Sequence, residues 1–332
     1  MFFGLICLVG LFLVIGVFNA EDVNAITHPF ISEKLADNVG LDSPDWNRFW
    51  QRRQGWGGRQ VRLPIDRQFN TTAAAFTGTG TRNIDNPKFL ADARYDLKEY
   101  FVAMSIADKE LALNSGKEQV INFTNSTVDN ARKSLVDTIT TDLWSTNASD
   151  VEKSIGIGDV LSITTTLGEV SVADFAAWIA NIDSTTTTLT IRTIHNLWVN
   201  GTEGLERPSV AFAQRDVFAK YASLLQNQQR FMTLKDANVS PLGDQLMFFD
   251  VPVIQSSYVT GTGGGTQDNL WVFLNEKYIM IFVASGFAAN LGRWKDMKPQ
   301  QAQIANSIEL KHTLACNNRR FQSAMTNIDP DL

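Results

Sequence analysis

The stretch from 302 to 316 constrains the fold most, because apolar and polar residues alternate along it. The odd positions are mostly polar, and the even positions carry Ala302, Ile304, Ile308, Leu310, Leu314 and Cys316. Asn306 and His312 are polar exceptions on the apolar side. Successive side chains of a strand point to opposite faces, so the pattern predicts a long strand with one buried face.

Other segments indicate both helices and strands. Apolar residues recur three or four apart over 127–144, and Ser126 with Asp129 resembles a capping box at the start of that helix. The same reasoning predicts a helix opening at Ser171, a helix over 191–200 that ends in a left-handed cap at Gly201, and a helix that follows a short strand at 209–213. Strand-forming residues dominate 246–249, 251–254, 270–274 and 278–283. Because helices and strands mix without regular alternation, the fold class is predicted as α+β.

A long hairpin is predicted near the start of the chain. Val61, Leu63 and Ile65 alternate with polar residues, as do the residues over 93–97, and a turn-rich stretch from 71 to 87 joins the two segments. Pro64 cannot donate to a strand ladder, so this strand is expected at a sheet edge or outside the main sheet.

Arginines crowd the segment before and along this hairpin, among tryptophans and glycines. We interpret the segment as an extended basic arm that binds acidic groups on a neighbouring molecule, with a solvated surface as the alternative. The candidate contact residues are Arg48, Arg52, Arg53, Trp56, Arg59, Arg62 and Arg67. Arg52, Arg53 and Arg59 are expected to pair with carboxylates of adjacent subunits.

Charge and cysteine content exclude several classes of protein. The formal net charge of −6 argues against a protein that coats nucleic acid, so any contact with a polyanion must be local. The two cysteines, Cys7 and Cys316, do not suffice for a disulfide framework or a structural zinc site. Residues 2–18 are uncharged and apolar, which is typical of a signal peptide or membrane anchor, although no Lys or Arg precedes them. The alternatives are a leader removed or packed during maturation and a start site placed too far upstream.

Motifs for catalysis are missing from the sequence. It has no Gly-x-Ser-x-Gly, His-Glu-x-x-His or Cys-x-x-Cys motif, and its three histidines are scattered. His195 is interpreted as a packed core histidine, and the glycine-rich stretch 261–266 as a loop that does not bind phosphate. We therefore assign no catalytic, cofactor-binding or metal-binding residue and expect no enzyme. An arm and a hairpin that cannot bury their apolar sides alone favour a self-assembling shell subunit.

The last third of the chain resembles the major capsid proteins of tailed bacteriophages, which have the HK97-like fold. The resemblance is carried by Arg207-Pro208, by Leu274-Asn275 with Tyr278, and by the closing run Asn318-Arg319-Arg320 with Gln322. The glycine that usually follows this glutamine is Ser323 here. Arg319 and Arg320 are accordingly candidates for contacts between subunits or for orienting the core, and a solvated pair at a strand end is the alternative.

The resemblance implies an N-terminal arm, an extended hairpin loop (E-loop), a long spine helix, and peripheral and axial domains. The expected division is a leader at 1–20, an arm at 21–58, a hairpin loop at 59–105, and the two domains at 106–332 with the spine helix at 127–144. It further implies an icosahedral shell of hexamers and pentamers around double-stranded DNA, assembled in the host cytoplasm. Portal, scaffold or decoration proteins are possible partners, DNA would be contacted nonspecifically, and membrane contact is expected only through the leader. An exported binding or adhesion protein is the alternative from another class, and an enzyme of unrecognised type is a third.

Overall fold

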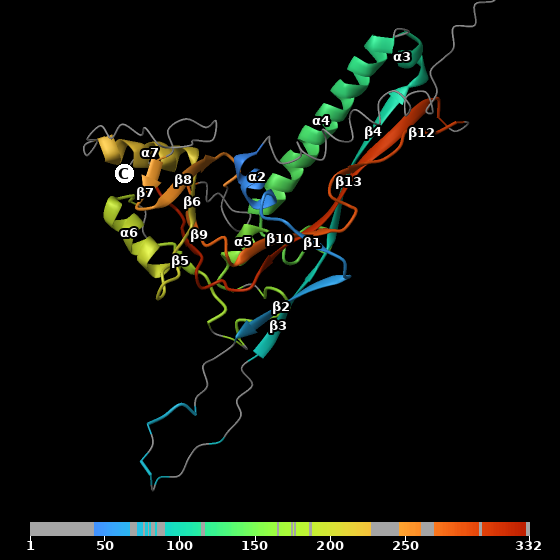
Figure 1. Ribbon diagram of the computed structural model, residues 1–332. Helices are drawn as coiled ribbons and strands as arrows, with labels where there is room; N and C mark the ends of the chain where they lie inside the picture. Colours follow the sequence, from blue (N-terminus) through green and yellow to red (C-terminus); the bar gives the residue numbers. More distant parts are fainter. Residues whose placement is uncertain are drawn as a thin grey trace, which may run out of the picture.

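The computed structural model describes residues 43–66, 72–75, 77–78, 80, 84, 90–113, 117–164, 166–173, 175, 177–185, 188–226, 246–259, 269–298 and 301–329. These residues form two six-stranded sheets, a two-stranded hairpin and several helices, which confirms the predicted α+β class (Figure 1). The leader, the first part of the arm, Arg67 and the glycine-rich stretch 261–266 lie outside the described residues.

The predicted long strand organises the first sheet. It is β13 (Gln303–Cys316), and its even positions are buried, including Asn306 and His312 at 6% and 3% exposure. Its partners are β4 (Lys98–Ala107), β10 (Ile279–Ala284), β11 (Asn290–Leu291) and β12 (Lys295–Asp296), and β1 (Gln54–Trp56) adds to β10 in parallel. Every strand that contacts β13 runs antiparallel to it.

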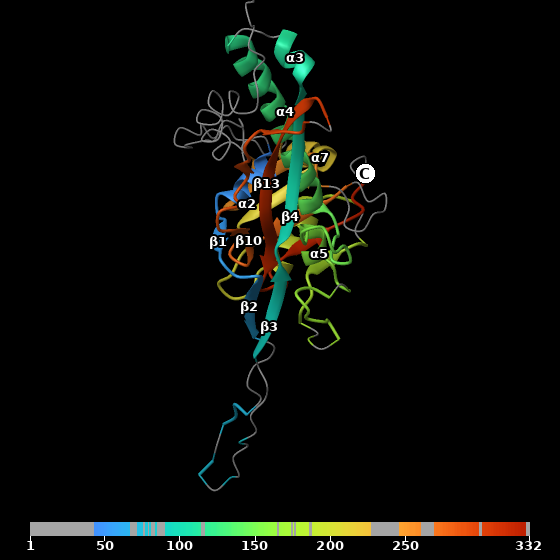
Figure 2. The same cartoon turned by 90° about the vertical axis from the view of Figure 1, so that its right-hand side faces the viewer.

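A long helix, α4 (Lys117–Trp144), runs beside β4 and β13 (Figures 1 and 2). It ends where the sequence predicts, but it begins at Lys117, so Ser126 and Asp129 lie inside the helix and form no cap. Thr127 instead donates its hydroxyl to the Phe123 carbonyl one turn earlier, at 3.0 Å. The shorter α3 (Asp108–Leu113) links β4 to this helix.

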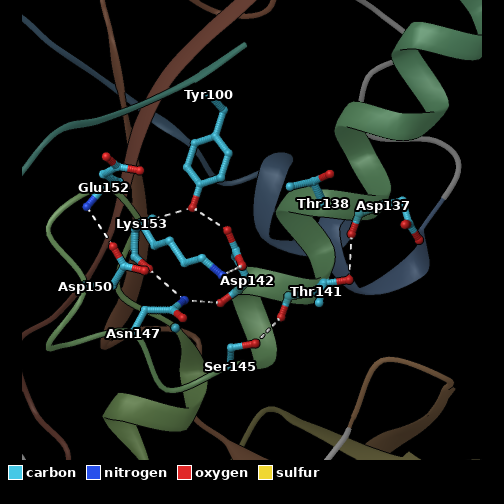
Figure 3. Close-up of polar contacts among 12 residues, drawn as sticks. Tyr100, Asp137, Thr138, Thr141, Asp142, Ser145, Asn147, Asp150, Glu152 and Lys153 are labelled. Carbon is cyan, nitrogen blue, oxygen red and sulfur yellow. Dashed lines mark hydrogen bonds and ion pairs between the residues drawn. The ribbon is translucent and has the colours of Figure 1, made fainter. Parts of the chain in front are cut away.

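A polar network fixes the end of α4 to its surroundings (Figure 3). The carboxylate of Asp142 accepts from the Tyr100 hydroxyl of β4 at 3.0 Å and pairs with Lys153 at 2.9 Å. The Asn147 amide donates to the Asp142 carbonyl at 2.7 Å, and the Ser154 backbone N–H donates to the Tyr100 oxygen at 2.9 Å. Helix, strand and the loop after the helix are therefore held as one unit.

The second sheet has the order β5 (Asn181–Asp183), β14 (Ser323–Met325), β9 (Trp271–Leu274), β6 (Val210–Gln214), β8 (Val251–Ser256) and β7 (Leu246–Phe248). α6 (Ile191–Asn200) and α7 (Arg215–Gln226) pack on it around a separate core that includes Leu197, Tyr221 and Trp271. The strands predicted between 246 and 283 and both helices are confirmed.

Two local predictions in this region are wrong. The segment from Ser171 forms turns and then β5, because Trp178 is buried and its indole N–H donates to the Leu167 carbonyl at 3.3 Å. These tertiary contacts outweigh the helical spacing of its apolar residues. Gly201 does cap α6, but with φ −82° rather than in the left-handed region.

The predicted hairpin is confirmed as β2 (Gln60–Asp66) paired antiparallel with β3 (Leu90–Asp96). Val61 lies opposite Tyr95, both are at most 1% exposed, and the Tyr95 hydroxyl donates to the Cys316 carbonyl of β13. The base of the hairpin thus buries its apolar face in its own chain, which corrects the premise that it cannot do so alone. The chain joins the first sheet from Lys98, so the hairpin ends before the predicted limit of 105.

Gly168 lies against this hairpin base and gives a first prediction. Its φ is +60°, its carbonyl accepts from the Arg94 N–H at 2.9 Å, and a Cβ there would lie 2.9 Å from the Ala93 Cβ. Gly168→Ala is expected to lower the free energy of unfolding by about 2 kcal/mol, measured by urea denaturation. Gly204→Ala is the matched control, because Gly204 has a similar φ of +63° but open space where a Cβ would lie. We expect it to lower the free energy of unfolding by about 1 kcal/mol, from the backbone conformation alone. Equal losses would show that the hairpin base is not packed against Gly168.

Candidate assembly surface

The segment expected to be an extended arm is partly a helix. α2 (Pro44–Trp50) begins with Ser43 as its N-cap and Pro44 in its first turn. Trp46, Phe49 and Trp50 are at most 4% exposed within the chain's own core. An extended arm is therefore the wrong description for 44–50, because the aromatic side chains line up on one face of a helix.

Arg48 and Arg52 hold this helix to the turn that follows β9. Arg48 donates two hydrogen bonds to the Glu276 carboxylate, at 2.6 and 3.0 Å, and Arg52 lies 3.3 Å from the same group. Glu276 is buried, and the Ser209 hydroxyl also donates to it at 3.0 Å. A buried carboxylate requires such partners. The carboxylate beside Arg52 thus belongs to its own chain, and the expected pairing of Arg52 with an adjacent subunit stays a prediction.

Arg53 and Trp56 also contact their own chain. The Arg53 guanidinium lies 4.5 Å from the centre of the Trp50 ring, and it donates to the Trp50 carbonyl at 3.2 Å. Trp56 of β1 packs edge-on against Phe282 of β10 with ring centres 5.6 Å apart. The contacts that the structure shows for Arg53 and Trp56 are therefore with residues of the same subunit.

Arg59 and Arg62 are different, because both lie exposed at the hairpin. Gln60 between them donates to Asp96 at 3.1 Å, and these four residues line one shallow surface. Within the part of the chain that the structure describes, neither arginine makes an ion pair. Of the candidate arginines of the arm and hairpin that the structure describes, these two remain available to another molecule.

The closing arginine pair has two opposite environments. Arg319 is 0% exposed, and its guanidinium donates to the carbonyls of Asp159 and Val160, both at 2.9 Å. Arg320 is half exposed and pairs with Glu203 at 3.0 Å. Arg319 is therefore an internal support of the short helix α5 (Ile157–Val160), which agrees with its expected role in orienting the core rather than with a contact between subunits.

Two histidine environments differ from what the sequence suggested. His195 is exposed on α6 beside Trp198, so its prediction as a core residue is wrong. His312 is buried, its ring packs against those of Trp46 and Tyr100, and burial lowers its pKa to about 3. The alternation of β13 already placed His312 on the buried face, and that signal could have identified it.

The described residues show neither a metal-binding cluster nor a membrane-spanning helix. In the described ranges, no group of three or more His, Cys, Asp or Glu side chains is arranged to hold a metal ion. No helix among the described residues combines the length and apolar character needed to cross a membrane.

Comparisons with known proteins find similarity in structure alone. No protein-family profile and no curated protein sequence matches the chain. A capsid protein of cyanophage A-1(L) is similar with a TM-score of 0.62 at 14% identity, over 87% of this chain and 93% of that chain. The capsid of an empty GTA particle gives 0.60 at 7% identity, over 85% and 96% of the two chains. The encapsulin of Synechococcus elongatus gives 0.52 at 12% identity, over 88% and 90%.

These similarities establish the fold. The chain has the HK97-like capsid fold, which confirms the resemblance seen in its closing third. At sequence identities of 7–14%, these similarities show the fold of the chain and no detail of its function.

Proposed function

We propose that this chain is a self-assembling shell subunit, the major capsid protein of a tailed phage that encloses double-stranded DNA. One observation carries the proposal: the structural likeness extends over 93% of a phage capsid chain, so it covers the whole subunit rather than one module. In this proposal the chain has no enzymatic role, and many copies form hexamers and pentamers of an icosahedral head.

The elements then take the following roles. Residues 21–58 form the N-terminal region, with α2 anchored on the body, and β2–β3 with their connection form the extended loop. α4 is the spine of the peripheral domain, together with the sheet built on β13. The second sheet with α6 and α7 is the axial domain.

The connection between β2 and β3 supports a role in contacts between subunits. Its described residues lie away from the body of the chain (Figures 1 and 2), and Ile84 is 88% exposed. Leu90, at the start of β3, is 59% exposed. The hairpin base is covered by its own chain, whereas this distal part gains cover from a neighbour.

Reversing the charges at the hairpin tests this role. Arg59→Glu with Arg62→Glu is expected to lower the particle yield at least about tenfold, because glutamates at positions that meet a neighbour's carboxylates repel them. Thermal unfolding of the subunit should stay unchanged, since both side chains are exposed. Lys133→Glu with Arg215→Glu makes the same change in net charge on exposed positions of α4 and α7 and serves as the control. A normal yield of the hairpin variant, measured by sedimentation, would contradict the proposed contact.

Assembly itself is the decisive experiment. The purified chain, with and without residues 1–20, is expected to form large particles in light scattering after size exclusion and in negative-stain microscopy. A stable monomer at high concentration would favour the alternative of an exported binding protein. Intact mass of the particle protein reports whether the leader is retained.

A shell that encloses something other than DNA is the second candidate, because the encapsulin likeness covers 90% of that chain. Particles isolated from the organism that encodes the chain distinguish the two. Nuclease-protected double-stranded DNA inside them supports the phage head, with portal, scaffold or decoration proteins as partners and DNA contacted nonspecifically. Enclosed protein without DNA supports a compartment.

A further inference from the structure

An aromatic cluster lies partly exposed on the domain formed by the second sheet. It consists of His195 and Trp198 on α6 and Phe249 in the turn between β7 and β8. The Phe249 ring lies 5.1 Å from that of Trp198 and 5.8 Å from that of His195, centre to centre. The Arg207 guanidinium lies 5.9 Å from the Trp198 ring. His195, Phe249 and Arg207 are exposed, whereas Trp198 is half-buried and packs against the core of this domain.

Phe249 is unfavourable in the isolated subunit for two independent reasons. Its φ is +52°, in the left-handed region, where a bulky residue costs roughly 1–2 kcal/mol relative to glycine. Its side chain is also 61% exposed, so the chain presents an aromatic ring to water. Backbone strain of this kind persists where the surroundings enforce it and often marks a functional contact.

The surroundings make Phe249 a rigid anchor for binding. Phe248 packs edge-on against its ring at 4.8 Å, and Trp198 and His195 flank it, so little side-chain entropy is lost when a partner covers it. Arg207 is exposed and makes no ion pair within the described residues. Aromatic and arginine side chains held together in this way are typical of binding hot spots.

The same chain carries a turn that complements this surface. Residues 203–206 form a tight turn in which Glu203 and Glu206 exchange backbone hydrogen bonds of 3.1 Å, and Gly204 has φ +63°. Leu205 at its tip is 96% exposed between the two acids. Arg320 and Lys277 pair with these glutamates and brace the turn. The two paired carboxylates stay 49% and 31% exposed, so an apolar tip flanked by acids complements an aromatic surface beside an unpaired arginine in polarity and charge.

We propose that the aromatic cluster, with Arg207, binds the 203–206 turn of a second copy of the chain. The inference rests on the proposed function, in that a shell subunit meets many copies of itself. Leu205 packs against the Phe249 and Trp198 rings, and the acids that flank it face Arg207. Because Leu205 is almost fully exposed, the turn does not cover the cluster of its own subunit.

Variants on the two sides test the contact. Phe249→Gly removes the ring and relieves the left-handed strain, so the subunit should unfold at an unchanged or higher temperature. Its threshold concentration for assembly, followed by light scattering, should rise at least about tenfold. Leu205→Ser should raise the threshold similarly, and the double variant should be no worse than the more affected single variant, because the two side chains share one contact. Phe249→Tyr should restore assembly, and Met247→Ser, at an exposed position on the same β-hairpin, is the matched control.

The outcomes separate this contact from the proposed function. Suppose that the wild type forms particles but Phe249→Gly or Leu205→Ser leaves the threshold concentration unchanged. This result would overturn the contact and leave the shell function standing. The same holds if the increases in threshold of the two single variants add up in the double variant. A wild type that stays monomeric would overturn both. Normal protein assembly combined with lost DNA retention in Phe249→Gly would assign the cluster to nucleic acid and also overturn the contact.

Discussion

Replacing Arg319 by methionine is expected to lower the free energy of unfolding of the subunit by about 3–5 kcal/mol. The Arg319 guanidinium is 0% exposed and donates to carbonyls of Asp159 and Val160 at 2.9 Å, of Trp178 at 3.3 Å, and of Ser162. Methionine fills similar volume but donates nothing, so these buried carbonyls lose the hydrogen bonds from the guanidinium, and the Asp159 carbonyl keeps the Ser162 N–H at 3.3 Å. The desolvation penalty of a buried acceptor without a partner is larger than the net contribution of one hydrogen bond to folding stability.

The position of these carbonyls explains why one side chain matters so much. α5 spans four residues, Ile157–Val160, so its last carbonyls lack intrahelical partners. The planar guanidinium reaches them and the Trp178 carbonyl together, which joins α5 to the chain before β5. Arg319→Lys is expected to recover a minor part of the loss, because one ammonium cannot span this set.

Arg320→Met is the matched control. Arg320 is the next residue, is half exposed, and pairs with Glu203 on the surface, so its loss should change the unfolding free energy by about 0.5 kcal/mol or less. Both variants are compared by urea denaturation of the unassembled subunit. Equal effects would contradict the internal role of Arg319.

The same arginine pair shows where sequence reasoning stops. Arg319 and Arg320 are chemically identical, and which of them is buried depends on α5 and Trp178, more than a hundred residues earlier in the chain. The ion pairs of Arg48 and Arg52 are equally hard to predict, because Glu276 comes within reach of them only when α2 packs on the body of the chain. Pairings between distant residues leave no local pattern.

Periodicity predicted what depends on local geometry. The alternation along β13, the hairpin β2–β3 and the end of α4 follow from which face of each element must be buried. The segment from Ser171 has helical spacing, yet the burial of Trp178 overrides it. The strained turn at Phe249 gave no sequence signal, because a phenylalanine there contradicts the usual turn chemistry.

Asp45 is predicted to make the stability of the subunit depend on pH. Its side chain is 0% exposed between α2, α4 and β8, where one oxygen accepts from the Trp144 indole N–H at 2.9 Å and from the Ser256 hydroxyl. Burial raises the pKa of Asp45 from 3.8 to about 6, although both hydrogen bonds act in the opposite direction. The folded chain therefore holds a proton that the unfolded chain releases at lower pH.

The direction of the effect follows from this difference. Between about pH 4 and 6 the folded state binds more protons than the unfolded state, so stability falls as the pH rises through this window and levels off above it. The expected total loss from Asp45 is roughly 3 kcal/mol. Asp45→Asn keeps an oxygen acceptor for Trp144 and Ser256 and carries no charge at any pH.

Asp45→Asn should therefore match the wild type near pH 4 and exceed its unfolding free energy by roughly 2–3 kcal/mol at pH 7, in urea denaturation at both values. Asp129→Asn, on the exposed face of α4, should follow the wild type throughout. Burial also raises the pKa of Asp159, so a slope of the same sign persists in every variant. The contribution of Asp45 is the difference between the two profiles, and parallel profiles for wild type and Asp45→Asn would show that this carboxyl ionises at the same pH in the folded and the unfolded chain. The hydrogen bonds from Trp144 and Ser256, which join α2 to α4 and β8, would then fully offset the cost of burying the charge of this carboxyl.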